Sequence, residues 1–160
     1  MSSQAMLSKK VILIGNFGVG KTSLTERFVH KRFSDEYLTT LGVRIDKKEV
    51  VVAHTKINLV IWDIAGEVTQ KKVNKSYYLG ASGVIYVFDL TRPVTYASIT
   101  AEISYVKETL PQAKVVLVGN KLDLVEEAPT VEAPFHYHLT SAKTGESVEA
   151  VFQDLATKLI

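Results

Sequence analysis

The chain has 160 residues, of which 46% are hydrophobic and 22% are charged, and 19 basic against 17 acidic side chains give a formal net charge of +2. This composition predicts one globular domain over residues 1–160, long enough to bury about two thirds of its unfolded surface. The balanced charge disfavours nucleic acid or a membrane surface as the main partner. Without cysteine, the sequence excludes disulfides, thiolate metal sites and cysteine-linked lipids.

The N-terminal sequence MSSQAMLSKK has no hydrophobic signal core, which predicts a cytoplasmic protein, and residues 1–8 are expected to be flexible. Three short hydrophobic runs then stand out because they are rich in β-branched residues and lack polar alternation. Such runs are typical of central parallel strands that are covered on both faces. They span residues 11–14, 84–88 and 115–118.

The segments around these runs predict helices and one hairpin. In residues 43–64, two strand-like runs meet at a short turn near His54 with no room for a helix, so we expect an antiparallel hairpin. Helical patterns span about residues 21–30, 68–78, 94–110 and 147–159.

The stretch before the last predicted strand is unusual. Between Asp123 and Ser141 it carries Pro129 and Pro134, which do not permit a normal helix. The helix there is expected to be missing or shortened to one turn. The predicted fold class is therefore α/β, a mostly parallel sheet with one antiparallel strand and helices on both faces.

A glycine-rich motif follows the first strand. Residues 15–22 read GNFGVGKT, which fits G-x-x-x-x-G-K-[ST] between a strand and a helix and predicts a P-loop NTPase. The glycines let main-chain N–H groups point at one anion, Lys21 is expected to reach the β and γ phosphates, and the Thr22 hydroxyl to ligate Mg²⁺. The predicted phosphate-binding residues are Gly15, Phe17, Gly18, Val19, Gly20, Lys21, Thr22 and Ser23.

Two later turns indicate which base is bound. In Asn120-Lys121-Leu122-Asp123, the Asp123 carboxylate can accept two N–H bonds from a guanine edge, whereas adenine presents no matching pair of donors. Asn120 is expected to tie this turn to the phosphate loop, and the Lys121 stem to cover the base plane. A backbone N–H in the turn Ser141-Ala142-Lys143 can meet the guanine carbonyl oxygen. Each turn alone is also typical of a solvated loop, but their order at strand ends favours a guanine nucleotide.

Two further elements are placed to sense a third phosphate. The sequence WDIAG ends a hydrophobic strand, where Asp63 can hold Mg²⁺ through water and the Gly66 N–H can bond the γ phosphate. The alternative is that this D-x-x-G is only a turn. Upstream, Thr39 and Thr40 are both candidates for sensing the third phosphate, the alternative for each is an ordinary edge-strand threonine, and spacing alone does not choose between them.

With these motifs, the chain resembles a Ras-superfamily small GTPase over nearly its whole length, closest to the Rab-like branch through TLGV, WDIAG and SYYLGA. A bacterial relative of that branch is one reading of this resemblance. The resemblance implies a molecular switch that binds GTP or GDP with Mg²⁺ and changes the shape of two loops on hydrolysis. It implies effector and regulatory proteins as partners, bound mainly in the GTP form. By match, Thr40 is the Mg²⁺ ligand, Phe33 the aromatic at the guanine edge and Tyr37 the switch tyrosine.

The resemblance also assigns an effector-binding surface. Ile45, Trp62 and Tyr77 match the hydrophobic triad that Rab effectors read, and the alternative is that these three side chains simply pack in the core. The sequence ends at Ile160 without a cysteine-bearing tail. We therefore expect no direct membrane anchor in this chain, and recruitment to a membrane would need another protein or a longer native chain.

Two departures from the family pattern affect catalysis. Glu67 occupies the place of the catalytic glutamine, and Phe17 stands where a small residue is usual. Gln70 lies three residues after Glu67, on the same face of the predicted helix, and is an alternative group for holding the attacking water. We expect slow GTP hydrolysis, with Lys21, Glu67 and Gln70 as the catalytic candidates.

Two other classes of function compete with a switch. One is a nucleotide-loaded scaffold module with negligible turnover. The other is a P-loop phosphotransferase, which would normally bring an arginine-rich lid and an acceptor site. The only arginines are Arg27, Arg32, Arg44 and Arg92, and they form no clustered lid pattern.

Overall fold

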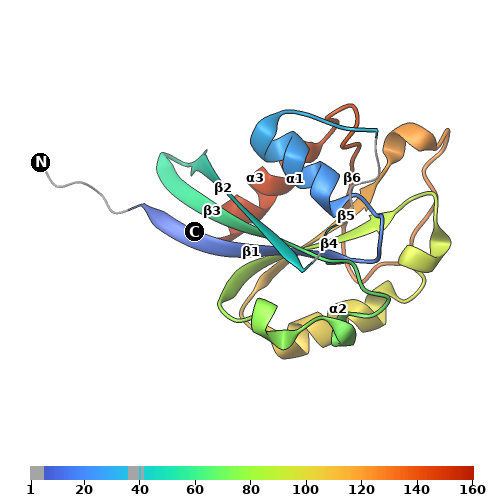
Figure 1. Ribbon diagram of the computed structural model, residues 1–160, viewed down its shortest axis with the longest axis horizontal. Helices are drawn as coiled ribbons and strands as arrows, with labels where there is room; N and C mark the ends of the chain where they lie inside the picture. Colours follow the sequence, from blue (N-terminus) through green and yellow to red (C-terminus); the bar gives the residue numbers. More distant parts are fainter. Residues whose placement is uncertain (1–5, 36–39, 41) are drawn as a thin grey trace, which may run out of the picture.

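The computed structural model describes residues 6–35, 40 and 42–160. Its centre is a six-stranded sheet in the order β2-β3-β1-β4-β5-β6 (Figure 1). β2 and β3 pair antiparallel, and the other neighbouring strands pair parallel. This confirms the predicted sheet. The strands are β1 Leu7–Gly15, β2 Val43–Val52, β3 Thr55–Ile64, β4 Ala81–Asp89, β5 Lys114–Asn120 and β6 Tyr137–Leu139.

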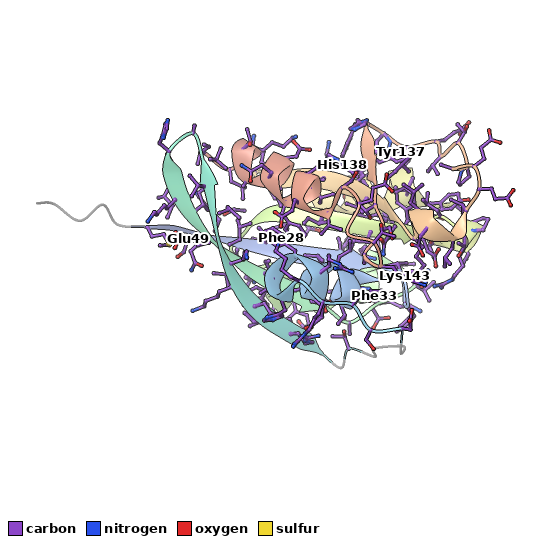
Figure 2. The ribbon with its side chains drawn as sticks, turned by 90° about the horizontal axis from the view of Figure 1, so that it is seen from above. Phe28, Phe33, Glu49, Tyr137, His138 and Lys143 are labelled. Atoms are coloured by element: carbon purple, nitrogen blue, oxygen red, sulfur yellow. The ribbon has the colours of Figure 1, made fainter. Side chains whose placement is uncertain are left out.

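Helices cover both faces of the sheet, with α1 and α3 on one side and α2 on the other (Figure 1). Alternate residues of the hydrophobic strands therefore enter two separate cores. In the first core, Phe28 of α1 stacks on Phe152 of α3 with ring centroids 3.9 Å apart, and Figure 2 shows Phe28 between the two helices. The helices are α1 Lys21–His30, α2 Ile99–Thr109 and α3 Val148–Lys158.

The predicted hairpin is present, and its turn is tight. Ala53 and His54 both have positive φ, 48° and 66°, which is the conformation a two-residue hairpin turn needs. The turn sets the register that pairs Ile45 with Trp62 and Arg44 with Asp63. The hairpin therefore begins shortly after Thr40, the predicted Mg²⁺ ligand, and ends with β3.

The predicted helix over residues 68–78 is wrong. Two 3-10 helices, Gln70–Lys72 and Lys75–Tyr77, replace it. Val73 and Asn74 between them are extended, and the Asn74 side chain accepts a hydrogen bond from the Ser76 N–H at 3.0 Å. An asparagine that bonds its own backbone in this way competes with helix formation.

The other predicted helices agree more closely with the structure. In the stretch 94–110, α2 follows a short 3-10 helix, Pro93–Thr95. Between β5 and β6 the helical structure is limited to one 3-10 turn, Leu122–Leu124, as expected from the two prolines. Val131, which lies between these prolines, is buried in the core between the sheet and α2, so this irregular segment still contributes to packing.

Of the N-terminal residues expected to be flexible, residues 1–5 lie outside the described range. β1 begins at Leu7. Among the helices that the structure describes, none combines the length and the apolar character needed to span a membrane.

Candidate functional site

A cavity of about 540 Å³ lies where the parallel strands end, the usual place for ligands in open α/β sheets. Segments far apart in the sequence line it, and Figure 2 shows Phe33 and Lys143 at the same end of the molecule. Gly15, Val19 and Ser141 are buried and are not among the lining residues. The predicted nucleotide-binding residues along the cavity are Phe17, Gly18, Gly20, Lys21, Thr22, Ser23, Phe33, Thr40, Gly66, Asn120, Lys121, Asp123, Ala142 and Lys143.

The phosphate loop is joined directly to the turn after β5. The Asn120 side-chain amide donates to the Val19 carbonyl at 3.0 Å, which confirms the predicted tie. Gly20, the N-cap of α1, has φ +103°, and a Cβ there would lie 2.2 Å from Asn120 Nδ2. Because any side chain at Gly20 would break this junction, the glycine serves packing as well as anion access.

Lys21 is buried at the phosphate end of the cavity. Its Nζ donates to the carbonyls of Gly15 at 3.3 Å and Asn16 at 2.9 Å. Burial lowers the pKa of Lys21 to about 8, the Asp63 carboxylate opposes this shift, and the Arg92 cation adds to it. An anion in the cavity would stabilise the charged form of Lys21, so this end of the cavity suits an anionic ligand.

Three oxygen-bearing side chains converge beside Lys21. Thr22 Oγ1 donates to Asp63 Oδ2 at 2.5 Å and lies 2.5 Å from Thr40 Oγ1. Burial raises the pKa of Asp63, against the hydrogen bond from Thr22 and the charge of Lys21. The other oxygen, Asp63 Oδ1, is buried without a hydrogen-bond partner among the described residues. Hard oxygen ligands around a buried carboxylate fit Mg²⁺.

At the opposite end of the cavity, the turns after β5 and β6 are joined. Ser141 Oγ donates to Asp123 Oδ1 at 2.7 Å, and the Ala142 N–H donates to Asn120 Oδ1 at 3.2 Å. Asn120 and Ser141 are buried, whereas Asp123 is exposed at the cavity. The structure therefore brings the two predicted base-binding turns together, with the Asp123 carboxylate accessible to a ligand.

The catalytic candidates separate in the structure. Glu67 lines the cavity next to Gly66, and a Cβ at Gly66 would lie only 2.7 Å from Phe17 Cα, so the segment after β3 and the P-loop touch here. Gln70 is buried outside the lining, with its backbone N–H donating to Glu102 of α2 at 2.7 Å. The expected common helical face of Glu67 and Gln70 is wrong, because no helix connects them.

The three predicted effector-binding residues meet at the surface. Ile45 pairs with Trp62 across β2 and β3, and the Trp62 and Tyr77 rings lie 6.4 Å apart. Ile45 is 49% exposed, while Trp62 and Tyr77 are half-buried. Lys10 Nζ lies 3.7 Å from the Trp62 ring centroid. These three side chains are thus neither fully exposed to solvent nor fully buried in the core.

Some contributors to the site were missed from the sequence, and two predicted residues cannot be placed. Tyr37 and Thr39 lie outside the described residues. Arg27 of α1 donates to the Ala142 carbonyl at 2.8 Å and supports the second base-side turn. This contact spans 115 positions in sequence, so no local signal indicated it. The additional lining residues are Ser34, Asp35, Gly42, Ala65 and Leu124.

A P-loop, an acidic strand end and two base-side turns around one cavity define a P-loop nucleotide-binding protein. The Ras family model matches residues 10–160. The chain is 36% identical to zebrafish (Danio rerio) Ras-related protein Rab-4A over 94% of this chain and 76% of that protein. It is 37% identical to mouse (Mus musculus) Rab-25 over 94% and 75%, and 32% identical to Dictyostelium discoideum Rab-24 over 96% and 82%.

The chain therefore belongs to the Ras family of small GTP-binding switch proteins and is Rab-like. GTP hydrolysis is the general activity of this family, and its members bind GTP or GDP, generally with Mg²⁺.

Proposed function

We propose that this chain is a single G-domain that switches between GTP-bound and GDP-bound states and hydrolyses GTP slowly without assistance. The observation that supports this most directly is that one continuous cavity has a proposed phosphate end at Lys21 and a proposed base end at Asp123. A guanine nucleotide has matching groups at both ends. A nucleotide bound at both ends would also connect the segments that move when the third phosphate is lost.

At the phosphate end, backbone N–H groups of the P-loop and the Lys21 ammonium would bind the phosphates. Thr22, Thr40 and Asp63 would hold Mg²⁺, which supplies positive charge to the phosphate oxygens when bound. Thr40 precedes the β2–β3 hairpin and Asp63 lies near its end. Loss of the third phosphate would therefore affect the conformation of this hairpin.

At the base end, Asp123 would accept two N–H bonds from the guanine edge, and Ser141 holds the Asp123 carboxylate in place through its hydroxyl. Lys121 and Phe33 would cover the base from their places along the cavity. Specificity for guanine over adenine would follow, because adenine would leave the polar groups of this turn unpaired.

Slow hydrolysis is proposed from two side chains at the phosphate end. Phe17 lines the cavity, where a benzyl group would exclude an arginine supplied by a partner. Glu67 places a carboxylate near the attacking water, where a like charge about 4 Å from phosphate costs roughly 4 kcal/mol at an effective dielectric of 20. The competing possibility is that Glu67 acts as a base. The burial of Gln70 against α2 disfavours Gln70 as the group that holds the water.

For partners, we propose effector and regulatory proteins that bind the switch loops and the Ile45, Trp62 and Tyr77 surface. Nucleic acid is not expected, and a cytoplasmic location is part of the proposal. The four arginines support a switch over a phosphotransferase. Arg32 and Arg44 pair with Glu26, and Arg27 and Arg92 bind backbone carbonyls, so they form no lid over the cavity.

The test is phosphate release by purified protein incubated with GTP at saturating Mg²⁺, with ATP as competitor. We expect release at about 10⁻⁴ s⁻¹, the scale of an unassisted small GTPase, and poor competition by ATP. Tight GTP binding with no release would support a scaffold module instead. Equal binding of ATP and GTP would contradict the guanine assignment.

A further inference from the structure

Arg92 connects the turn after β4 to the phosphate loop. Its Nη1 donates to the Phe17 carbonyl at 2.7 Å, across 75 positions in sequence. Phe17 and the following Gly18 both line the cavity. Arg92 does not line the cavity itself, so its hydrogen bond can act on a ligand only through the P-loop backbone.

The turn that carries Arg92 is held by several hydrogen bonds. Asp89 Oδ1 accepts from the N–H and the hydroxyl of Thr91 at 2.8 and 2.7 Å. The Thr95 N–H donates to the Arg92 carbonyl at 2.9 Å, and Pro93 directly follows Arg92 at the start of a 3-10 helix. Because these bonds fix the turn, little backbone freedom is lost when the guanidinium binds the Phe17 carbonyl.

The same carboxylate also contacts the base-side turn. Asp89 is fully buried at the end of β4, and its Oδ2 lies 3.0 Å from Lys121 Nζ and 3.7 Å from Arg92 Nη1. Lys121 lines the base end of the cavity, and Arg92 reaches the phosphate loop. One buried carboxylate thus holds a cation at each end of the proposed nucleotide site.

We propose that Arg92 is a positioning residue for the phosphate end of the site, which rests on the proposed guanine-nucleotide binding. In a trans peptide, the C=O and N–H groups point in opposite directions. A cation bound to the Phe17 carbonyl therefore polarises the peptide that supplies the Gly18 N–H and fixes its orientation. The Gly18 N–H becomes a stronger, preoriented donor to the phosphates beyond the first.

A purely structural Arg92 would give a different result. If the guanidinium only stabilised the turn, its removal would weaken all guanine nucleotides alike, including GMP. If Arg92 instead orients and polarises the Gly18 N–H, the loss of affinity on its removal grows with the number of phosphates in the nucleotide. Three variants separate these effects: Arg92→Met removes charge and donors, Arg92→Gln keeps an amide donor without charge, and Arg92→Lys keeps the charge.

The experiment measures dissociation constants for GMP, GDP and a non-hydrolysable GTP analogue, with Mg²⁺ present. Lys56→Ala is the matched control, since this exposed cation lies on the β2–β3 hairpin and pairs with Glu49 at 3.8 Å. We expect Arg92→Met and Arg92→Gln to weaken GDP and the analogue about tenfold and GMP less than twofold. Arg92→Lys should recover most of the loss, and Lys56→Ala should match the parent.

Equal weakening of GMP, GDP and the analogue would overturn the positioning role in favour of a structural one. Parent-like binding by Arg92→Gln would overturn it too, and the Gln-to-Lys comparison decides the matter if Arg92→Met does not fold. A parent protein that binds no guanine nucleotide would instead overturn the proposed function, so the two failures are distinct.

Discussion

At the scale of single residues, the proposed selectivity for guanine depends on Asp123. Its carboxylate is accessible at the cavity and is oriented by the Ser141 hydroxyl at 2.7 Å. In Asp123→Asn, an amide replaces the double acceptor and can donate to the extra carbonyl of xanthine. We expect GTP to bind about a hundredfold more weakly and xanthosine triphosphate to bind more tightly than in the parent.

Competition binding with GTP, xanthosine triphosphate and ATP measures this change. Glu127→Gln, which makes the same carboxylate-to-amide change in the following loop outside the cavity lining, is the control and should leave all three unchanged. An unchanged preference for GTP in Asp123→Asn would remove Asp123 from base recognition.

Phe17 and Glu67 are the residues expected to limit the chemical step. Phe17 is 49% exposed at the cavity, and Glu67 lines the same end. Glu67→Gln should restore a neutral contact to the attacking water and raise the single-turnover rate by up to about a thousandfold, because it removes the like charge that costs roughly 4 kcal/mol. Phe17→Gly should open the site, and the double variant should be fastest.

Val68→Ala, which alters the exposed neighbour of Glu67 outside the lining, serves as the control for these rates. A parent that already hydrolyses GTP rapidly, with no change in Phe17→Gly, would show that the steric argument is wrong. If Gln70→Ala alone slows the reaction, the catalytic role belongs to Gln70 despite its burial against α2.

At the scale of elements, Glu26 of α1 joins the two ends of the segment that contains Thr40. Its carboxylate bonds Arg32, just after α1, at 2.5 Å and Arg44, in β2, at 2.6 Å. The hydrogen bond from Arg32 lowers the pKa of Glu26, burial opposes this, and Arg44 adds to the lowering. A carboxyl group with a depressed folded-state pKa stabilises the fold above its ordinary pKa and loses this effect as pH falls.

Glu26→Gln should therefore reduce the free energy of unfolding by about 1 to 2 kcal/mol at pH 7. The difference in the free energy of unfolding between the parent and Glu26→Gln should shrink below about pH 4. There the Glu26 carboxyl of the parent becomes protonated and is then neutral, like the amide. Urea denaturation at matched nucleotide concentration measures both effects. Glu149→Gln, which alters an exposed carboxylate paired with Lys31, is the control, and an equal loss there would contradict a special role for Glu26.

Local patterns predict most of the elements and much of the site. The P-loop, the hairpin at His54 and the proline-broken stretch before β6 follow from residues close together in sequence. The helix predicted over residues 68–78 is wrong because the hydrophobic spacing there is helical, whereas the Asn74 side chain closes a local turn. The contact of Arg92 with Phe17 spans 75 positions and that of Arg44 with Glu26 spans 18, so both depend on tertiary approach and no short sequence window contains them.

At the scale of the whole molecule, the site exists only when the sheet is assembled. The P-loop follows β1, Asp63 and Gly66 come from the end of β3, and the base-side turns follow β5 and β6. In the unfolded chain these groups are far apart and offer no common cavity. A nucleotide with Mg²⁺ should therefore bind the folded state alone and stabilise the entire domain.

Thr22→Ala tests this coupling through the metal. Thr22 lies in the first turn of α1 and donates to Asp63 at 2.5 Å, so its replacement removes one proposed oxygen ligand while the two cores stay intact. At a ligand concentration of 100 times Kd, linkage adds about 2.7 kcal/mol, or about 5–10 °C in Tm for a domain of this size. We expect that shift in the parent with GDP and Mg²⁺, and less than half of it in Thr22→Ala, with little difference between them when Mg²⁺ is chelated. Thr157→Ala, which removes an exposed hydroxyl from α3, should shift like the parent. A full Mg²⁺-dependent shift in Thr22→Ala would exclude Thr22 as a metal ligand.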